Sequence, residues 1–189
     1  GIIQDTAGYA LSGGIAGRIL GESIVKTSVS TMAIQATANS TMGGQSPTNC
    51  YQGGLFGFAY ESEVHDCLSS SYIFQNSAVA ANNAGGIVGY LSVAYSFSST
   101  SGNEMKYLTN FYNCYFSGQV YSASSASHTN IYGSTYHISS WTGELPENLA
   151  FHNCFYDNQL SLTSDDEYGR PTSFFTSGAL PDGFDANVW

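Results

Sequence analysis

The stretches that decide the fold of this 189-residue chain are Gly13-Gly14-Ile15-Ala16-Gly17, Gly53-Gly54-Leu55-Phe56-Gly57 and Gly85-Gly86-Ile87-Val88-Gly89. The copies begin 40 and then 32 residues apart, a period typical of repeat proteins. Shifting the chain by 40 residues also aligns residues beyond the glycines: Ile24 with Val64, Ser30 with Ser70, Ile34 with Phe74 and Gln35 with Gln75. Whole units therefore recur, and we expect them to stack on one another.

The composition favours a strand-rich protein whose surface carries few charges. Charged residues make up 10% of the chain, against about 25% in an ordinary globular domain. The chain also holds 14 Tyr and 11 Phe. Aromatic side chains fit the pleated surface of a sheet, whereas Lys, Arg and Glu, which favour helices, are scarce.

The charge balance argues against nucleic acid as a partner. The basic residues are Arg18, Lys26, Lys106 and Arg170, and the formal net charge is -10. A protein that binds a phosphate backbone needs several basic side chains on one face, and anionic membranes also attract basic clusters. No apolar run reaches the roughly 18 to 20 residues of a membrane span, so we expect no membrane insertion of this segment.

The glycine pairs predict sharp corners between stacked units. Neighbouring strands lie about 4.8 Å apart, and glycine tolerates both a positive φ and the close approach of another backbone. The apolar residue after each pair, which is Ile15, Leu55 or Ile87, would then lie in an interior column.

The units are predicted to span residues 1–162. A fourth unit lacks its glycine pair and is recognised only by the stretch from Phe151 to Tyr156. The Ser-rich range of about 121–149 is predicted to be a loop that projects from the stack. Residues 163–189 are predicted to cap the last unit or to form a tail, with one helical turn between Thr172 and Leu180.

The four cysteines occur in similar frames, namely Asn49-Cys50-Tyr51, Asp66-Cys67-Leu68, Asn113-Cys114-Tyr115 and Asn153-Cys154-Phe155. We interpret the frames as equivalent places in successive units, where small apolar thiols pack in a column. Buried free thiols are favoured, and disulfides remain an alternative. A zinc site is disfavoured because no C-x-x-C pair is present.

The cores Gly-Ile-Ala-Gly, Gly-Leu-Phe-Gly and Gly-Ile-Val-Gly, with Asn-Cys-aromatic in three of the cysteine frames, resemble the GLUG motif of bacterial surface proteins. Such motifs are known from filamentous-haemagglutinin-like adhesins and from non-catalytic regions of bacterial IgA peptidases. The resemblance implies an all-β fold, a right-handed parallel β-helix (β-solenoid). It implies no catalytic residue, so none is carried over to this chain.

The residues themselves offer little chemistry for an enzyme. The four histidines are scattered, and no nucleophile elbow is present. The acidic run Asp165-Asp166-Glu167, or Asp182 with Asp185 and Asn187, offers oxygen ligands for calcium, but solvated acidic turns are favoured. We therefore expect no catalytic site, no metal site and no cofactor.

Aromatic side chains suggest a binding role instead. Tyr132, Tyr136 and Trp141 lie in the Ser-rich range, where they would form a platform for sugar rings. Packing in the interior is the alternative for most of the tyrosines.

Repeat architecture without catalytic residues favours a non-catalytic domain of a secreted or surface-attached bacterial protein. We expect it to be extracellular and to act in adhesion, with a glycan or protein of a host or neighbouring cell as partner. The alternative is a spacer or substrate-docking region of a larger secreted protease or glycan-degrading enzyme.

Overall fold

The computed structural model describes residues 1–5, 9–36, 49–75, 83–98, 102–106, 109–122, 128–129, 132–138, 150–160 and 168–189. Within these ranges the chain is mostly β-strand, and the one helix, α1 (Thr172–Thr176), is short. Neighbouring strands are parallel in every described pair except β11 with β12. The prediction of an all-β fold with parallel strands is therefore confirmed.

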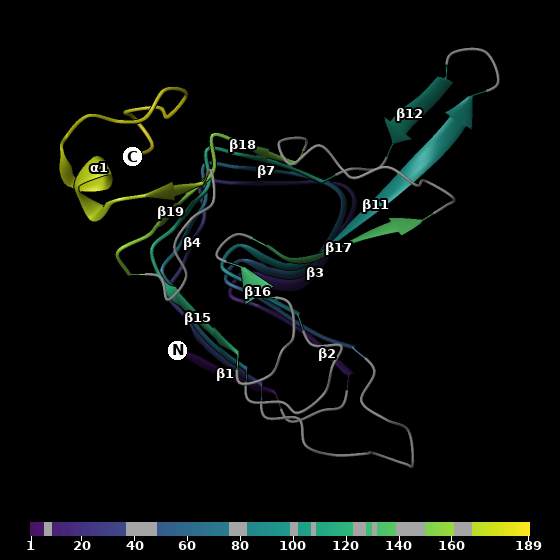
Figure 1. Cartoon of the computed structure of the whole chain (residues 1–189), viewed down its shortest axis with the longest axis horizontal. Helices are drawn as coiled ribbons and strands as arrows, with labels where there is room; N and C mark the ends of the chain where they lie inside the picture. Colours follow the sequence, from purple (N-terminus) through teal and green to yellow (C-terminus); the bar gives the residue numbers. More distant parts are fainter. Residues whose placement is uncertain are drawn as a thin grey trace.

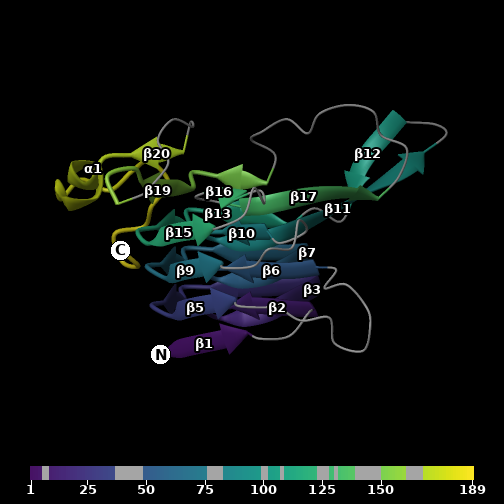
Figure 2. The same cartoon turned by 60° about the horizontal axis from the view of Figure 1, so that its bottom comes forward.

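Strands from successive parts of the chain lie side by side in four sheets (Figures 1 and 2). In hydrogen-bonded order, sheet A contains β1 (Ile2–Asp5), β5 (Ala33–Ala36), β9 (Tyr72–Gln75) and β15 (Gln119–Ser122). Sheet B contains β16 (His128–Thr129), β10 (Asn83–Gly85), β6 (Asn49–Gly53) and β2 (Tyr9–Gly13).

Sheet C contains β12 (Gly102–Lys106), β11 (Val88–Ser98), β7 (Phe56–His65), β13 (Asn110–Tyr112) and β18 (Phe151–His152), with β17 (Tyr132–Ile138) on β11 and β3 (Ala16–Lys26) on β7. Sheet D contains β20 (Gly169–Arg170), β19 (Phe155–Asp157), β14 (Tyr115–Phe116), β8 (Leu68–Ser69) and β4 (Val29–Ser30). Each sheet thus collects strands from several repeats, and the first repeats lie at the opposite end of the sheets from the last (Figure 2).

The three glycine pairs lie one above another, as the sequence predicts. Gly53 pairs with Gly13 on one side and with Gly85 on the other. A Cβ at Gly54 would collide with the carbonyl oxygen of Gly86, so the pairs are needed because the backbones approach closely. The expected positive φ is not the reason, because the described glycines with positive φ are Gly21, Gly178 and Gly183.

The apolar residue after each pair forms the expected interior column. Leu55 and Ile87 are fully buried, whereas Ile15, at the end of the column, is 37% exposed. The amide of Ile15 donates to the carbonyl of Leu55 at 3.0 Å, and the amide of Leu55 donates to that of Ile87 at 2.9 Å. The column therefore packs best in the second and third repeats.

The constant shift of 40 residues is wrong beyond the first part of the repeat. Leu20 pairs with Tyr60, 40 positions later, but Ser23 pairs with Ser62, one position fewer. The first repeat has two residues with positive φ here, Gly21 and Glu22, and the second repeat has Glu61. The extra residue forms a bulge that the shift ignores.

This one-residue slip changes which side chains share a face, because side chains alternate along a strand. Ile24 pairs with Glu63 on the outside of the sheet and not with the buried Val64. Likewise, Ile34 pairs with Ile73, and both are fully buried. The interior thus matches isoleucine with isoleucine, which the sequence alignment at a shift of 40 misses.

The interior consists of further files, by which we mean residues at paired positions of successive strands. One file contains Ile34, Ile73 and Val120 in sheet A, and another contains Val64, Phe111 and Phe151 in sheet C. These residues belong to a single hydrophobic cluster. The rings of Phe111 and Phe151 stack with their centroids 4.9 Å apart, so the files pack along the direction in which the repeats succeed one another.

The Ser-rich range of about 121–149 is not only a projecting loop. Its strands β16 and β17 are parallel to β10 and β11, with His128 paired to Ala84 and Tyr132 to Val88. Thr, Tyr and Ile have high strand propensity, which the serine content of the range obscures. A projecting part does occur elsewhere, where β11 and β12 form an antiparallel hairpin that extends from the body (Figure 1).

The C-terminal residues add to sheet D and then cover it. Strand β20 pairs with β19, and Tyr168 packs against the hydrophobic cluster. Helix α1 lies within the range where one helical turn is predicted, Thr172 to Leu180. The buried carboxylate of Asp157 fixes this segment, because it accepts a hydrogen bond from the Thr172 hydroxyl at 2.6 Å and one from the Gln159 amide at 2.9 Å.

Candidate functional site

The predicted sugar platform lies only in part within the described structure. Tyr132 and Tyr136 lie in β17, where their backbones pair with Val88 and Ser92 of β11. Trp141 lies outside the described residues. The structure describes the side chain of none of these three residues, so the platform stays a prediction.

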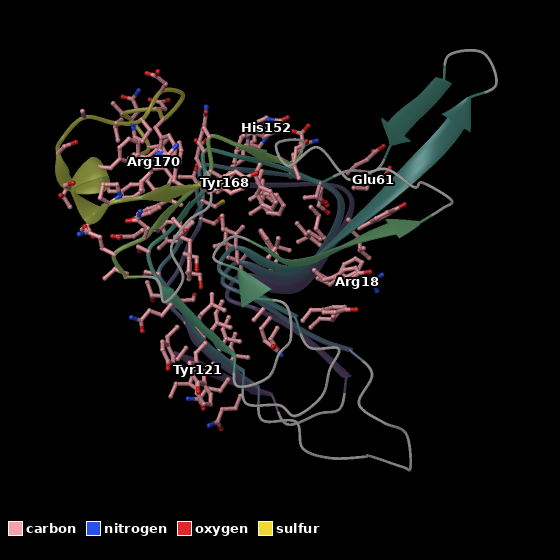
Figure 3. The ribbon with its side chains drawn as sticks, in the orientation of Figure 1. Arg18, Glu61, Tyr121, His152, Tyr168 and Arg170 are labelled. Carbon is pink, nitrogen blue, oxygen red and sulfur yellow. The ribbon has the colours of Figure 1, made fainter. Side chains whose placement is uncertain are left out.

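Parallel stacking also brings outward-facing side chains into contact with one another, within a strand and between neighbouring strands, and we call these groups ladders. Because neighbouring strands are in register, an aromatic side chain on the outside of one strand lies next to the outward side chain of the next. Ladders of this kind occur on sheets A, C and D. Figure 3 labels a member of the sheet A ladder, Tyr121, and two of the sheet C ladders, Arg18 and His152.

The sheet A ladder consists of Tyr72 and Phe74 on β9 and Tyr121 on β15. Phe74 and Tyr121 stack with ring centroids 5.1 Å apart and planes 5° from parallel. The ring of Tyr72 lies 6.4 Å from that of Phe74 and 12° from parallel. Tyr72 is 43% exposed and Tyr121 is 40% exposed, so this ladder is open to solvent.

Sequence reasoning missed the sheet A ladder although a signal is present. In Tyr72-Ile73-Phe74 the middle residue is fully buried, so its two neighbours point outward. Gln119-Val120-Tyr121 repeats the pattern around the buried Val120. The pattern is hidden because these two repeats are separated by an insertion, so no constant shift aligns Phe74 with Tyr121.

The first sheet C ladder contains two histidines around a tyrosine. The ring of Tyr112 stacks on His65 at 4.7 Å and on His152 at 4.6 Å. The Nε2 atom of His65 lies 3.1 Å from a carboxylate oxygen of Glu63, and that of His152 lies 3.3 Å from Oδ1 of Asn110. His65 and His152 are therefore packed in a ladder, whereas the side chains of His128 and His137 are not described.

A second sheet C ladder begins at a basic residue. The guanidinium of Arg18 lies 5.1 Å from the centre of the Phe58 ring, and Phe58 stacks on Tyr90 at 5.4 Å. Tyr90 also stacks on Tyr51 of sheet B at 4.3 Å. Cation–π contact and stacking together make this ladder a packed contact between the sheets.

The sheet D ladder is covered by the C-terminal residues. Phe175 of α1 stacks on Tyr115 at 3.8 Å, and Phe174 meets Phe155 edge-on at 5.5 Å. The guanidinium of Arg170 lies 4.8 Å from the centre of the Phe155 ring. Burial raises the pKa of Tyr115 above its ordinary value, because the charged phenolate is disfavoured away from water.

Three of the four cysteines form the predicted column, and all three are buried free thiols: Cys67, Cys114 and Cys154. The thiol of Cys67 donates to the carbonyl of His65 at 3.1 Å. A hydrogen bond with Cys114 and burial raise the pKa of Cys67, and burial raises the pKa of Cys114. The thiols of Cys67 and Cys114 are consequently protonated and weakly reactive at neutral pH.

The placement of Cys50 in the same column is wrong. Cys50 lies in β6 and pairs with Ala10, in a different sheet from the corner that Cys67 follows. In the first repeat the position equivalent to Cys67 belongs to Ser28, whose carbonyl accepts a hydrogen bond from the Leu68 amide. The frame Asn49-Cys50-Tyr51 therefore resembles the others in sequence only.

Two hollows lie on the described surface. One, of about 270 Å³, is lined by residues that include Glu22, Glu61 and Glu63. The other, of about 630 Å³, is lined by residues that include His152, Tyr168 and Arg170. Within the described ranges, no group of three or more His, Cys, Asp or Glu side chains is arranged to hold a metal ion.

The predicted alternatives for calcium are described only in part. Asp165-Asp166-Glu167 lies outside the described residues. Oδ1 of Asp185 accepts hydrogen bonds from the backbone and side-chain nitrogens of Asn187, each at 2.8 Å. The carboxylate of Asp185 thus stabilises a local turn.

No protein-family model, curated protein or solved structure matches this chain. The resemblance to GLUG-motif proteins therefore stays a prediction from the glycine cores and cysteine frames quoted above. No helix in the described part of the chain is long and apolar enough to cross a membrane.

Proposed function

We propose that this chain is a segment of a right-handed parallel β-helix from a secreted or surface-attached bacterial protein, and that it acts in adhesion. The parallel register of sheets A to D and the recurring glycine pairs support the β-helix. The GLUG-like cores support the surface location. The partner would be a glycan or a protein on a host or neighbouring cell.

The observation that carries the adhesive role is the ladder of Tyr72, Phe74 and Tyr121 on parallel strands, in which the two tyrosines are exposed to solvent. Exposed aromatic side chains are costly to leave in water and are enriched where proteins bind partners. Phe74 and Tyr121 lie at paired positions of neighbouring strands, so the ladder offers adjacent rings to an extended partner. The platform of Tyr132, Tyr136 and Trp141 remains a further candidate on the same scaffold.

Binding of the whole chain to a glycan array and to intact cells tests this function. We expect saturable binding to one of them. Absence of binding to both would contradict adhesion and favour the alternative role as a spacer or substrate-docking region. That alternative predicts a protease or glycan-degrading domain elsewhere in the full-length protein.

A further inference from the structure

We propose that the outer face of sheet A binds a neutral polysaccharide, whose sugar rings stack on the ladder of Tyr72, Phe74 and Tyr121. This inference rests on the proposed adhesive function and assigns it a site and a ligand class. Four observations support it: the outward orientation of the side chains, the exposure of the two tyrosines, the lack of charged side chains on this face, and the position of Tyr121 at the end of the ladder.

The orientation follows from the register of sheet A. Ile34, Ile73 and Val120 form a buried file, so the residues on either side of them point outward. The outward residues whose side chains are described are Ile2, Gln4, Ala33, Gln35, Tyr72, Phe74, Gln119 and Tyr121. Figure 3 shows Tyr121 on the outer side of the sheet, away from the interior.

Exposure distinguishes this ladder from the similar one on sheet D. There the rings of Tyr115 and Phe155 are covered by Phe174 and Phe175 of the C-terminal segment. On sheet A, Tyr72 and Tyr121 keep about two-fifths of their surface in contact with water. Among the described residues, the C-terminal segment covers the sheet D ladder, whereas Tyr72 and Tyr121 of the sheet A ladder are accessible to a ligand.

The charge of the face selects the ligand class. The eight outward residues named above include no acidic or basic side chain, and the two tyrosines are their only ionisable groups. The whole chain, by contrast, has a formal net charge of -10. Glutamine amides lie beside the rings: Nε2 of Gln4 donates to Oε1 of Gln35 at 3.4 Å, and Nε2 of Gln119 donates to the carbonyl of Leu160 at 3.1 Å.

Aromatic faces next to amides fit a sugar chain better than a charged partner. A pyranose ring offers an apolar face of C–H groups to an aromatic ring, and its hydroxyls match amide donors and acceptors. Binding sites for small polar ligands combine apolar surface with a few oriented polar groups in the same way. A neutral polysaccharide satisfies both parts of the face and needs no counter-charge.

Among the described strands, the ladder ends at Tyr121. Phe74 stacks on one side of the Tyr121 ring, and β15 is the last strand of sheet A among the described strands. A sugar ring on the other side of Tyr121 would extend the stack by one ring. Tyr72, displaced along the strand, would contact a neighbouring sugar of the same chain.

Affinity gel electrophoresis tests the proposal with defined probes. Hydroxyethyl cellulose, dextran and galactomannan are the neutral polysaccharides, and polygalacturonate is the anionic comparison. The variants are Tyr121→Ala, Tyr72→Ala and Tyr121→Phe, which keeps the ring. Tyr112→Ala is the matched control, because it removes a stacked outward tyrosine from sheet C. Thermal unfolding of each variant verifies that it is folded.

We expect at least one neutral polysaccharide to retard the parent and polygalacturonate not to. Tyr121→Ala and Tyr72→Ala should each weaken that binding about tenfold or more, while Tyr121→Phe and Tyr112→Ala should bind like the parent. Unchanged binding by a folded Tyr121→Ala variant would overturn this site but leave adhesion intact. Binding to cells or proteins without any neutral polysaccharide would overturn the ligand class alone. If the parent binds no polysaccharide, no protein and no intact cells, both the site and the adhesive function fail.

Discussion

At the scale of single residues, one backbone position explains the frames of Cys67, Cys114 and Cys154. A φ between 49° and 53° occurs at four equivalent positions: Thr27, Asp66, Asn113 and Asn153. In the last three, the next residue is the cysteine of the frame. Asn and Asp adopt this left-handed conformation more readily than other non-glycine residues. Nδ2 of Asn113 also donates to Oδ1 of Asp66 at 3.1 Å, which links two successive corners.

Thr27 is the residue of this set that suits its conformation least, because a β-branched side chain disfavours positive φ. We therefore expect Thr27→Asn to raise the free energy of unfolding by about 1 kcal/mol. Chemical denaturation measures the change. The reciprocal variant Asn113→Thr is the control and should lower stability by a similar amount or more, because it also removes the hydrogen bond to Asp66. A loss of stability in Thr27→Asn would contradict this explanation of the corner.

The buried thiols predict a pH dependence. The pKa values of Cys67 and Cys114 are raised in the folded state above the ordinary value of 9.0. Their contribution to stability is therefore complete below about pH 9 and falls as the pH rises further, because only the unfolded thiols ionise. The expected slope is about 1.4 kcal/mol per pH unit for each thiol.

Urea denaturation at several pH values between about pH 8 and pH 10, a range that spans the ordinary thiol pKa, measures this slope. The double variant Cys67→Ser/Cys114→Ser provides the control, because serine does not ionise in this range. The parent should lose more stability than the variant over the same interval. Parallel pH profiles for the two proteins would show that the thiols do not have raised pKa values.

At the scale of strands and corners, the sequence predicts the features that recur without change. The Gly-Gly corners and the interior column of Leu55 and Ile87 follow from the repeat itself. The slip between Leu20 and Ser23 does not, because Gly21-Glu22 and Glu61 make equivalent bends with different numbers of residues. After the bulge, an alignment at a constant shift of 40 pairs the wrong residues, whereas in the structure the extra residue changes the backbone only locally.

The Leu55 column gives a prediction at this scale. Leu55→Ala should lower the free energy of unfolding by about 2 to 5 kcal/mol, because it leaves a cavity between Ile15 and Ile87. Ile15→Ala is the matched control in the same column and should cost about 1 kcal/mol, because the side chain is already partly in water. Equal costs in denaturant titrations would contradict the difference in burial along the column.

At the scale of the whole molecule, the two ends of the stack differ. The C-terminal residues continue sheet D through β20 and pack Tyr168 on the hydrophobic cluster. At the other end, β1, β2 and β4 form the outer strands of their sheets, and Ile15 of the interior column is partly exposed. The C-terminal segment thus extends one sheet and covers its outer face. That it caps the last unit stays a prediction.

The strands hidden in the Ser-rich range show why the sequence alone underestimates the number of stacked segments. Neither β16 nor β17 follows a glycine pair, and Thr129 lies beside Gly85 where the other repeats have glycine. These strands form by pairing with β10 and β11, which are distant in sequence, and the sequence has no local pattern that predicts this pairing. The exposed ladder of Tyr72, Phe74 and Tyr121 is hidden for the same reason, because it arises only when distant strands come into register.

The central claim is that successive repeats lie parallel and in register, and an engineered cross-link tests it most directly. Ile24 is 61% exposed and pairs with Glu63 on the outside of sheet C, whereas Val64 is fully buried. Neighbouring parallel strands bring their Cα atoms within the range of about 4.4 to 6.8 Å that a disulfide needs.

The measurement is the yield of intramolecular disulfide in Ile24→Cys/Glu63→Cys under mild oxidation, determined by peptide mass mapping in a Cys50→Ser background. We predict nearly complete cross-linking of this pair and none in Ile24→Cys/Val64→Cys, whose second side chain points into the interior. Cross-linking of the second pair and not the first, or of neither, would contradict the register and with it the stacked arrangement of the repeats.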